Sequence, residues 1–291
     1  MALAVRLRSA VSLLGRFPAL AGVDLDVPEG EILLVRGANG AGKTTLLRAL
    51  AGLTPFTSGE AEVLGVDLRK DRKALRRRVA LLGHATFLYD DLTVADNLRF
   101  SAKAAGASPA SANMAMARLG LDGRLRDVPA AKLSAGQRRR VAVAAVVARR
   151  ADLWLLDEPH AGLDAAGRDL LDGLVREAAA GGATVVLASH ELDRAAALAT
   201  RTVTMAGGQV GGGLLASDVP REVVLTAPGG VGAPPRRGAG VGAPAGKADT
   251  APGGVGAPPG AGPRRGRQTS TEGEAREGRK PGRGRSVVAA M

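Results

Sequence analysis

Short apolar runs alternate with longer amphipathic stretches over roughly the first 225 residues. Residues 32–35 and 153–156 are continuous apolar runs of strand length, which is typical of strands buried on both faces. A helical face is clearest where apolar residues recur three and four positions apart, at Leu170, Leu171, Leu174, Val175 and Ala178. Two glycines at 181–182 end that stretch. The pattern therefore predicts strands that alternate with helices.

The same pattern predicts the order of the elements. Strands are expected near residues 3–8, 23–27, 31–36, 79–83, 153–157, 184–189 and 202–205. Helices are expected at 43–51, 71–77, 93–105, 110–119, 136–150, 167–180 and 191–200. Such alternation favours an α/β fold with a mainly parallel sheet covered on both faces. The stretch from about 86 to 133 lacks strand signals and is expected to belong to an inserted helical piece, which with the following helix spans about 86–150.

Composition changes after residue 225. Beyond it, Gly-Gly-Val-Gly-Ala-Pro occurs at 229 and 253 with a near copy at 239, and arginine clusters separate the copies. A segment with so few large apolar residues buries too little surface to offset its ordering entropy. We therefore expect a folded domain over 1–212, a short connector at 213–225 and a disordered Gly/Pro/Ala/Arg-rich tail at 226–291.

The positive charge is concentrated in that tail. It holds eleven of the 40 Lys and Arg and four of the 28 Asp and Glu, and therefore carries +7 of the net charge of +12. A solvated extension without a partner is the ordinary interpretation, and nonspecific contact with anionic lipid or nucleic acid is the alternative. Because no Phe, Tyr or Trp follows Trp154, base stacking is not available to it. No specific nucleic-acid partner is expected.

Several classes of protein are excluded by what the sequence lacks. There is no cysteine, so disulfides and thiolate metal sites are ruled out. No apolar stretch approaches the roughly 20 residues of a membrane-spanning helix. The N-terminus resembles a signal peptide superficially, but Arg6 and Arg8 interrupt its apolar run and no clear cleavage motif follows, so an opening strand is expected. Work at a membrane would therefore require a partner.

A phosphate-binding loop follows the apolar run at 32–35. Residues 37–44 read Gly-Ala-Asn-Gly-Ala-Gly-Lys-Thr, a complete G-x-x-x-x-G-K-[ST] sequence between a predicted strand and a predicted helix. Its glycines let backbone N–H groups turn toward an anion, and the helix dipole favours phosphate at the same point. Lys43 is expected at the β- and γ-phosphates and the Thr44 hydroxyl at Mg²⁺. The ATP-binding residues predicted here are Gly37, Asn39, Gly40, Ala41, Gly42, Lys43, Thr44 and Thr45.

Two carboxylates end another predicted strand. In Leu153-Trp-Leu-Leu-Asp-Glu-Pro159, four apolar residues precede Asp157 and Glu158. Open parallel sheets bind ligands at the carboxyl ends of their strands, so this pair is expected at the phosphate site. Asp157 is predicted to support Mg²⁺ coordination, and Glu158 to orient and deprotonate the attacking water. Acidic residues that merely cap a strand are the alternative when the pair is considered alone.

Three further motifs follow in a fixed order, and with them the chain resembles the ATPases of ABC transporters. Leu-Ser-Ala-Gly-Gln at 133–137 is similar to their LSGGQ signature, with Ala135 in place of one glycine; Ala-Gly-Leu-Asp ends at Asp164, and Ser-His-Glu is centred on His190. The resemblance covers roughly residues 3–210. It implies a P-loop NTPase fold of ABC type with an antiparallel β edge and an inserted helical subdomain.

The resemblance also implies roles for these motifs. Ser134 and Gly136, with Gln137 beside them, would contact the γ-phosphate held by a partner subunit, which implies two composite sites in a head-to-tail dimer. Asp164 would couple the two sites, and His190 would touch the γ-phosphate as a switch residue. A lone histidine after a strand is otherwise the ordinary interpretation of His190.

The chain departs from the family pattern at two points. The glutamine usual ahead of the helical insert is missing, and His84 or Ala85 stands there, depending on the alignment. By the resemblance, this position senses Mg²⁺ and communicates with the transporter, and His84 is the candidate to take that role through an imidazole nitrogen. Leu14 falls where an adenine-stacking tyrosine is common, and Phe17 nearby is the alternative for stacking. His160 receives no role.

A narrower resemblance links four segments, Leu-Gly-His at 82–84, 92–100, 133–141 and 153–159, to the ATP-binding subunit of the haem exporter of bacterial cytochrome c biogenesis. It implies an ATPase on the cytoplasmic face of the cell membrane, paired as a homodimer or with a second ATPase subunit and bound to permease subunits. Exporters of drugs or polysaccharides use similar sequences. A soluble ABC ATPase acting on ribosomes or DNA is the other alternative, although only one nucleotide domain and no heptad array are present.

Overall fold

The computed structural model of this chain describes residues 2–215. The predicted tail at 226–291 lies outside the described residues, and so does most of the predicted connector. Strand β10 (Gln209–Leu215) extends three residues past the predicted end of the folded domain. No helix within 2–215 is long and apolar enough to cross a membrane.

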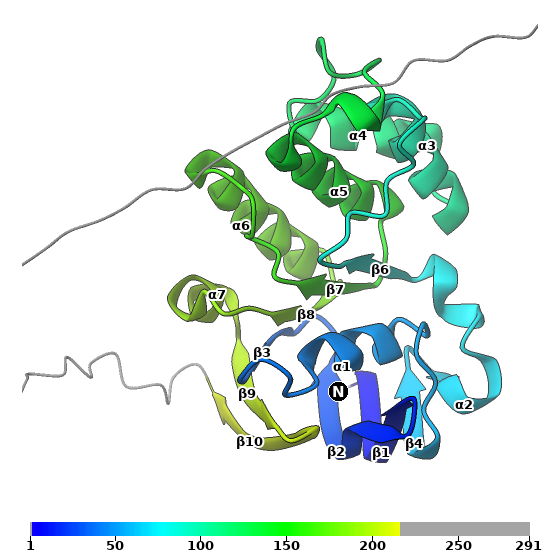
Figure 1. The fold of residues 1–291 in the computed structure, drawn as a ribbon, viewed down its shortest axis with the longest axis vertical. Coiled ribbons are helices and arrows are strands. Elements are labelled where there is room, and N and C mark those ends of the chain that lie inside the picture. Colours follow the sequence, from blue (N-terminus) through cyan, green and yellow to red (C-terminus); the bar gives the residue numbers. More distant parts are fainter. Residues whose placement is uncertain (1, 216–291) are drawn as a thin grey trace, which may run out of the picture. The chain divides into compact units, whose positions relative to one another are not determined.

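A six-stranded sheet forms the centre of the fold. Its strand order is β10–β9–β3–β8–β7–β6, made by β10, β9 (Arg201–Ala206), β3 (Ile32–Arg36), β8 (Thr184–Ala188), β7 (Leu153–Asp157) and β6 (Val79–Leu82). Every neighbouring pair is parallel except β9 with β10. The mainly parallel sheet expected from the sequence is therefore present (Figure 1).

A second, antiparallel sheet contains the N-terminus. Its order is β2–β1–β4–β5, made by β2 (Phe17–Pro28), β1 (Leu3–Leu14), β4 (Ser58–Val63) and β5 (Val66–Asp67). The expected antiparallel β region is thus confirmed, but β4, β5 and β10 were not predicted. The sequence of β4, Ser-Gly-Glu-Ala-Glu-Val, has only two apolar residues, and β10 contains three glycines, so neither carries a strong strand signal.

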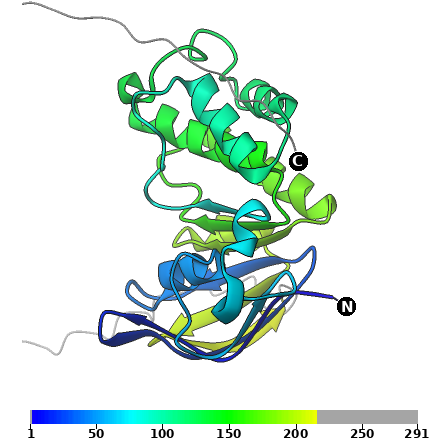
Figure 2. The same ribbon diagram turned by 90° about the vertical axis from the view of Figure 1, so that its right-hand side faces the viewer.

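The two faces of the central sheet pack into different cores. Along β3, Ile32 and Leu34 join one hydrophobic cluster, whereas Leu33 and Val35 join the other. This alternation follows from the two-residue period of a strand. One cluster contains α1 (Lys43–Leu50) and the antiparallel sheet, and the other contains the remaining long helices. Figure 2 shows these two layers on opposite sides of the sheet.

Three helices form the predicted insert. They are α3 (Val94–Ala105), α4 (Pro109–Arg118) and α5 (Ala135–Arg149), which pack against one another. The Thr93 side chain caps α3 at its start, and Gly106 ends it in a left-handed conformation. The chain returns to the sheet through β7, and then follow α6 (Ala165–Ala180), β8 and α7 (Leu192–Leu198).

The helix expected over 71–77 is wrong. The structure has a single turn, α2 (Leu68–Asp71), followed by a 3₁₀ helix at Ala74–Arg77. The Asp71 carboxylate accepts hydrogen bonds from the backbone N–H groups of Lys73 and Ala74 at 3.1 and 3.2 Å. These local side-chain hydrogen bonds favour a turn in place of a continuous helix between the two pieces.

Candidate functional site

The parallel register brings three chemically active segments to one edge of the sheet. Strands β3, β8 and β7 are neighbours, and Ala188 pairs with both Val35 and Asp157. The phosphate loop follows β3, the two carboxylates stand at the end of β7, and residues 189–191 follow β8. The predicted strand-end residues therefore meet at the carboxyl edge, where open parallel sheets bind ligands.

Glycine is required at two points of the phosphate loop. Gly37 has φ +151°, and a Cβ there would lie 2.2 Å from the Met205 carbonyl oxygen. Gly42 has φ +106°, and a Cβ there would lie 2.6 Å from the Ala19 carbonyl oxygen. Side chains at either position would collide with backbone. The loop is thus shaped as a backbone cradle directly before the N-terminus of α1.

The remaining loop residues lie around that cradle. Lys43 is buried, and its ammonium donates to the carbonyl oxygens of Gly37 at 2.7 Å and Ala38 at 3.1 Å. These contacts hold the cation over the loop. The others predicted for phosphate line the loop and the first turn of α1, where Asn39, Gly40 and Thr44 are exposed, Thr45 is half-buried and Ala41 is buried.

A hydroxyl and a carboxylate from different strand ends form a set of hard oxygen donors. The Thr44 hydroxyl donates to Asp157 Oδ2 at 2.8 Å, and the Asp157 side chain is buried. Mg²⁺ prefers oxygen ligands and is commonly held by few protein groups together with phosphate. The residues present therefore fit Mg²⁺.

Glu158 contacts the residue that follows β8. Its Oε2 lies 2.7 Å from His190 Nδ1 and also accepts from the His190 backbone N–H at 3.2 Å. The hydrogen bond that His190 donates to the Glu158 carboxylate raises the pKa of His190 above its ordinary value, and the negative charge of Glu158 adds to this. Glu158 has φ +48°, a left-handed conformation unusual for a residue other than glycine. Such strain is found at functional sites.

The signature residues are arranged around the N-terminus of α5. The Ser134 hydroxyl accepts from the Gln137 N–H at 3.2 Å, and the Gln137 side chain accepts from the Ser134 N–H at 2.9 Å, which forms a capping box. A Cβ at Gly136 would lie 3.3 Å from the Gly162 carbonyl oxygen, so the two segments are close. Within residues 2–215, no hydrogen bond joins the signature to the phosphate loop.

Asp164 connects to the same helix. Its carboxylate accepts from the Gly167 N–H at 2.9 Å and so caps α6. The Arg140 guanidinium lies 3.3 Å from Asp164 Oδ1, which joins the signature helix to the start of α6. The signature and Asp164 are thus linked to each other. Among residues 2–215, no side-chain hydrogen bond joins them directly to Thr44, Asp157, Glu158 or His190, which we call the strand-end group.

Two buried polar residues beside the site were not identified from the sequence. Arg139 donates from its guanidinium to the carbonyl oxygens of Gly83, Asp157 and Glu158. Burial lowers the pKa of Arg139. In the sequence, Arg139 is one of three consecutive arginines. Residues 141–144 of α5 are all buried. The helical periodicity therefore does not indicate which of the three arginines points inward.

His160 is the second residue. It is 1% exposed, and its Nε2 lies 2.8 Å from Asp172 Oδ1 on α6. The other Asp172 oxygen pairs with Arg194 of α7 at 2.7 Å. This network connects the segment after β7 to two helices, which gives His160 a packing role that the sequence did not indicate.

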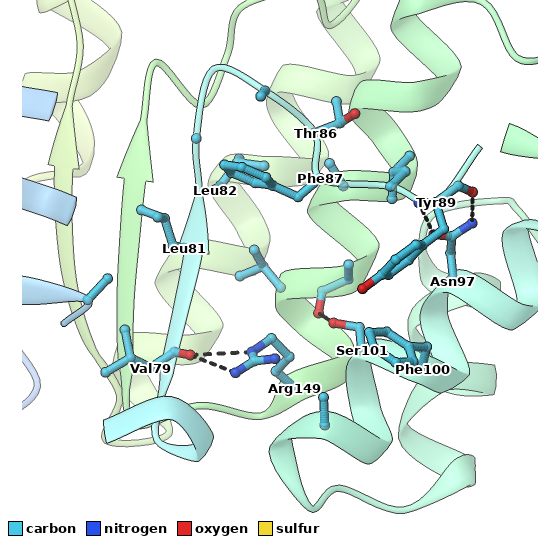
Figure 3. A pocket seen from close by; sticks show the side chains of 18 of the residues that line it. Val79, Leu81, Leu82, Thr86, Phe87, Tyr89, Asn97, Phe100, Ser101 and Arg149 are labelled. Atoms are coloured by element: carbon cyan, nitrogen blue, oxygen red, sulfur yellow. Dashed lines mark hydrogen bonds between the residues drawn. The ribbon is translucent and has the colours of Figure 1, made fainter. Parts of the chain in front are cut away.

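A groove lies beside the segment in which the family glutamine is missing. It has a volume of about 550 Å³ and is lined by residues 85–89 together with parts of α3 and α5. Three exposed aromatics mark it, Phe87, Tyr89 and Phe100, and the last two rings meet edge to face at 5.0 Å (Figure 3). Ala85 lines the groove, His84 does not, and both are exposed.

Leu14 and Phe17 are the two positions considered for stacking on adenine. Leu14 and Phe17 face each other as partners at the turn between β1 and β2, and both are exposed. Phe17 is 80% exposed and is free to stack.

Comparison with known proteins agrees with the geometry. The family model described as ABC transporter matches residues 20–161. The cytochrome c biogenesis ATP-binding export protein CcmA of Bordetella bronchiseptica is 43% identical over 201 residues, which cover 68% of this chain and 89% of that protein. The protein of the same name from Bradyrhizobium diazoefficiens is 39% identical over 183 residues, which cover 63% of this chain and 90% of that protein.

Solved structures share the fold. The structure of an ATP-binding subunit of an ABC transporter has a TM-score of 0.68 at 26% identity, covering 72% of this chain and 89% of that one. A cassette solved as a post-hydrolysis dimer with ADP and phosphate has a TM-score of 0.67 at 24% identity, covering 73% of this chain and 98% of that one. The expected P-loop fold of ABC type is thereby confirmed. The chain belongs to the ABC transporter family as one of its ATP-binding, ATP-hydrolysing subunits.

Proposed function

We propose that this chain powers a membrane exporter of cytochrome c biogenesis from the cytoplasmic face of the membrane. The observation that carries the proposal is the assembly of phosphate loop, paired carboxylates and His190 at one sheet edge, in a chain 43% identical to a protein named for that export. Haem is the cargo that the resemblance favours. An exporter of a drug or polysaccharide is the alternative.

In the proposed mechanism the loop and helix α1 hold the triphosphate. Backbone N–H groups of residues 37–45 and the Lys43 ammonium neutralise the β- and γ-phosphates. Thr44 and Asp157 would hold Mg²⁺, which when bound neutralises charge on the phosphate oxygens. Their hydroxyl and carboxylate oxygens, 2.8 Å apart, are ready to share one cation.

Glu158 acts as general base. Its carboxylate accepts a proton from the attacking water as the oxygen bonds to the γ-phosphorus and the bond to ADP breaks. The contact with His190 at 2.7 Å fixes the orientation of the carboxylate. His190, 70% exposed at its side chain, is then available to the γ-phosphate.

The signature supplies the other half of the site from a second copy. Ser134, Gly136 and Gln137 form a capped helix N-terminus that suits an anion, and Asp164 lies beside it. Because this group makes no hydrogen bond with the loop in the described part of its own chain, we infer that it meets the γ-phosphate of a partner chain. Two such sites form in a head-to-tail dimer of this chain, and one structural neighbour was solved as a dimer.

Motion passes to permease subunits through the helical insert. The aromatic groove of Phe87, Tyr89 and Phe100 supplies an exposed apolar surface (Figure 3), and exposed apolar patches mark interaction sites. The groove is lined in part by the segment directly after β6. Strand β6 itself ends beside β7, at the sheet edge where the phosphate loop lies. The groove is therefore the proposed docking surface for the permease.

The test is capture of partners from solubilised membranes of the source organism. The Glu158→Gln chain with ATP serves as bait, and mass spectrometry identifies what co-purifies. The matched control carries Phe87→Asp and Phe100→Asp in addition, which replaces two of the three exposed aromatics of the groove with charged residues and leaves the phosphate loop unchanged.

The proposal would be supported if small multispanning cytochrome-biogenesis proteins co-purify with the bait and do not co-purify with the groove variant. A different permease would keep the transporter role and change the cargo. Ribosomal or DNA-bound proteins without any permease would overturn it.

A further inference from the structure

One guanidinium joins the helical insert to the ends of β6 and β7, two neighbouring strands of the six-stranded sheet. Arg139 lies in the second turn of α5, five residues after Ser134, and is 6% exposed. Its Nη1 donates to the Gly83 carbonyl oxygen at 2.7 Å, directly after β6. Its Nη2 donates to the carbonyl oxygens of Asp157 at 3.2 Å and Glu158 at 2.5 Å, at the end of β7.

The backbone that Arg139 contacts is strained at the residue proposed as general base. Glu158 has φ +48° and precedes Pro159, whose ring further restricts the residue before it. A strained conformation persists only where its surroundings hold it. The Asp157 and Glu158 carbonyls both point to one buried donor, which fixes the peptide groups on either side of Glu158.

The charge of Arg139 is buried at a free-energy cost that apolar packing would avoid. Burial lowers its pKa, and the negative charges of Asp157 and Glu158 oppose that shift. Its Nε is buried without a hydrogen-bond partner among the described residues. A buried charge with an unsatisfied donor is unfavourable for packing alone, which points to a function for the contacts that remain.

We infer that Arg139 is a positioning residue for ATP hydrolysis: it holds the Glu158 backbone so that the carboxylate faces the attacking water, and it ties that position to the insert and to the segment beginning at Gly83. Arg139 does not touch the substrate. When the insert moves relative to the sheet, the guanidinium transmits the movement to Glu158. The inference concerns hydrolysis itself and does not depend on the cargo.

The test compares Arg139→Gln and Arg139→Lys with the unchanged full-length chain. Steady-state ATPase assays with Mg²⁺ give kcat and KM, a fluorescent ATP analogue gives Kd, and thermal unfolding monitors the fold. Arg138→Gln is the matched control, because Arg138 precedes Arg139 on the same helix and contacts Ala130 and Asp90 instead.

We expect Arg139→Gln to lower kcat by about 10- to 100-fold, since small misplacement of a catalytic group has effects of that size. KM and Kd for ATP should change by less than about threefold, because the phosphate loop is untouched. Arg139→Lys keeps the charge and reaches fewer carbonyls, so it should recover part of kcat. Arg138→Gln should keep the kcat of the unchanged chain.

Two results would overturn the inference. One is a folded Arg139→Gln chain whose kcat is unchanged. The other is a parallel loss of kcat, ATP affinity and thermal stability in both variants, which would make Arg139 a structural residue. If Arg139→Gln does not fold, the Lys variant decides between the same outcomes: a selective fall in kcat supports positioning, and an unchanged kcat rejects it.

Discussion

The strand-end group and the signature group are organised in opposite ways. At the sheet edge, side chains from separate strand ends already contact one another, as Thr44 with Asp157 and Glu158 with His190 do. At the start of α5, the side chains of Ser134 and Gln137 each accept a hydrogen bond from the backbone N–H of the other residue, within four residues of sequence. One group is assembled by long-range pairing and the other by local capping.

The difference shows what each half of the site needs. Parallel register alone brings the strand ends together, so a single chain completes that half. The capped N-terminus of α5 makes no hydrogen bond with the phosphate loop among residues 2–215, so in our proposal its dipole meets the phosphate of a second chain. In the proposed site, one half is therefore preassembled in a single chain, and the other half would be supplied on association with a second copy.

The largest effect is expected from removing the proposed base in the preassembled half. Glu158→Gln should lower ATPase turnover by about 100- to 10,000-fold, the range typical of general acid–base catalysis. ATP binding should persist because the phosphate loop is unchanged. Glu177→Gln, in an exposed ion pair with Arg118, is the control and should hydrolyse normally. Undiminished turnover in Glu158→Gln would reject the role.

A second experiment separates the halves by complementation. Lys43→Ala should lose ATP binding, whereas Ser134→Arg should keep ATP binding in the monomer and lose turnover. Neither variant should hydrolyse ATP alone. Mixed, they should recover activity, because one site of the mixed dimer combines the intact loop of one chain with the intact signature of the other.

Activity of the mixture is measured at fixed total protein with varied ratio. A maximum near equal amounts is the expected profile. A mixture no more active than its parents, although it forms dimers, would mean that both halves of a site come from one chain.

A moderate effect on stability is expected beneath the strand-end group. Asp172→Asn weakens the contacts to buried His160 and to Arg194, and should lower the free energy of unfolding by about 1–3 kcal/mol. For a domain of this size that corresponds to a few degrees in Tm. Asp169→Asn, which removes only the exposed partner of Arg194, is the control. Equal Tm values for both variants would show that the contact between Asp172 and His160 does not stabilise the fold beneath the site.

The smallest effect is a pH dependence of the pair between Glu158 and His190. Because the folded protein raises the pKa of His190 above the ordinary 6.5, the contribution of His190 to stability is fully present below that value. It is lost as the pH rises through the folded pKa. The difference in unfolding free energy between the unchanged chain and His190→Gln should therefore shrink from acid to mildly basic pH in denaturant titrations. A difference that grows with pH would contradict the pairing.

The sequence predicted where the strand-end residues lie because the signals for these positions are local. Residues 32–44 contain strand, glycine loop and helix start in succession, and 153–158 end an apolar run with two carboxylates. The parallel sheet then follows from alternation of elements. The antiparallel sheet was only partly predicted, because β4 and β5 are short and polar and are stabilised by pairing with β1 rather than by their own propensity.

Contacts between elements that are distant in the chain could not be predicted from the sequence. The sequence does not distinguish the three arginines at 138–140. Arg138 contacts Asp90, Arg139 contacts the carbonyls of Asp157 and Glu158 at the end of β7, and Arg140 contacts Asp164. Which one turns inward depends on how α5 packs on the end of the sheet. His160 was likewise indistinguishable from a surface histidine until α6 placed Asp172 beside it.

The most direct test of a site completed by a second copy is sedimentation velocity of the Glu158→Gln chain across an ATP titration. The account predicts a monomer without nucleotide and a dimer at saturating ATP. It also predicts that Ser134→Arg in the same chain abolishes the dimer while ATP still binds. A chain that remains monomeric at saturating ATP, or dimerises equally with Ser134→Arg, would contradict the account.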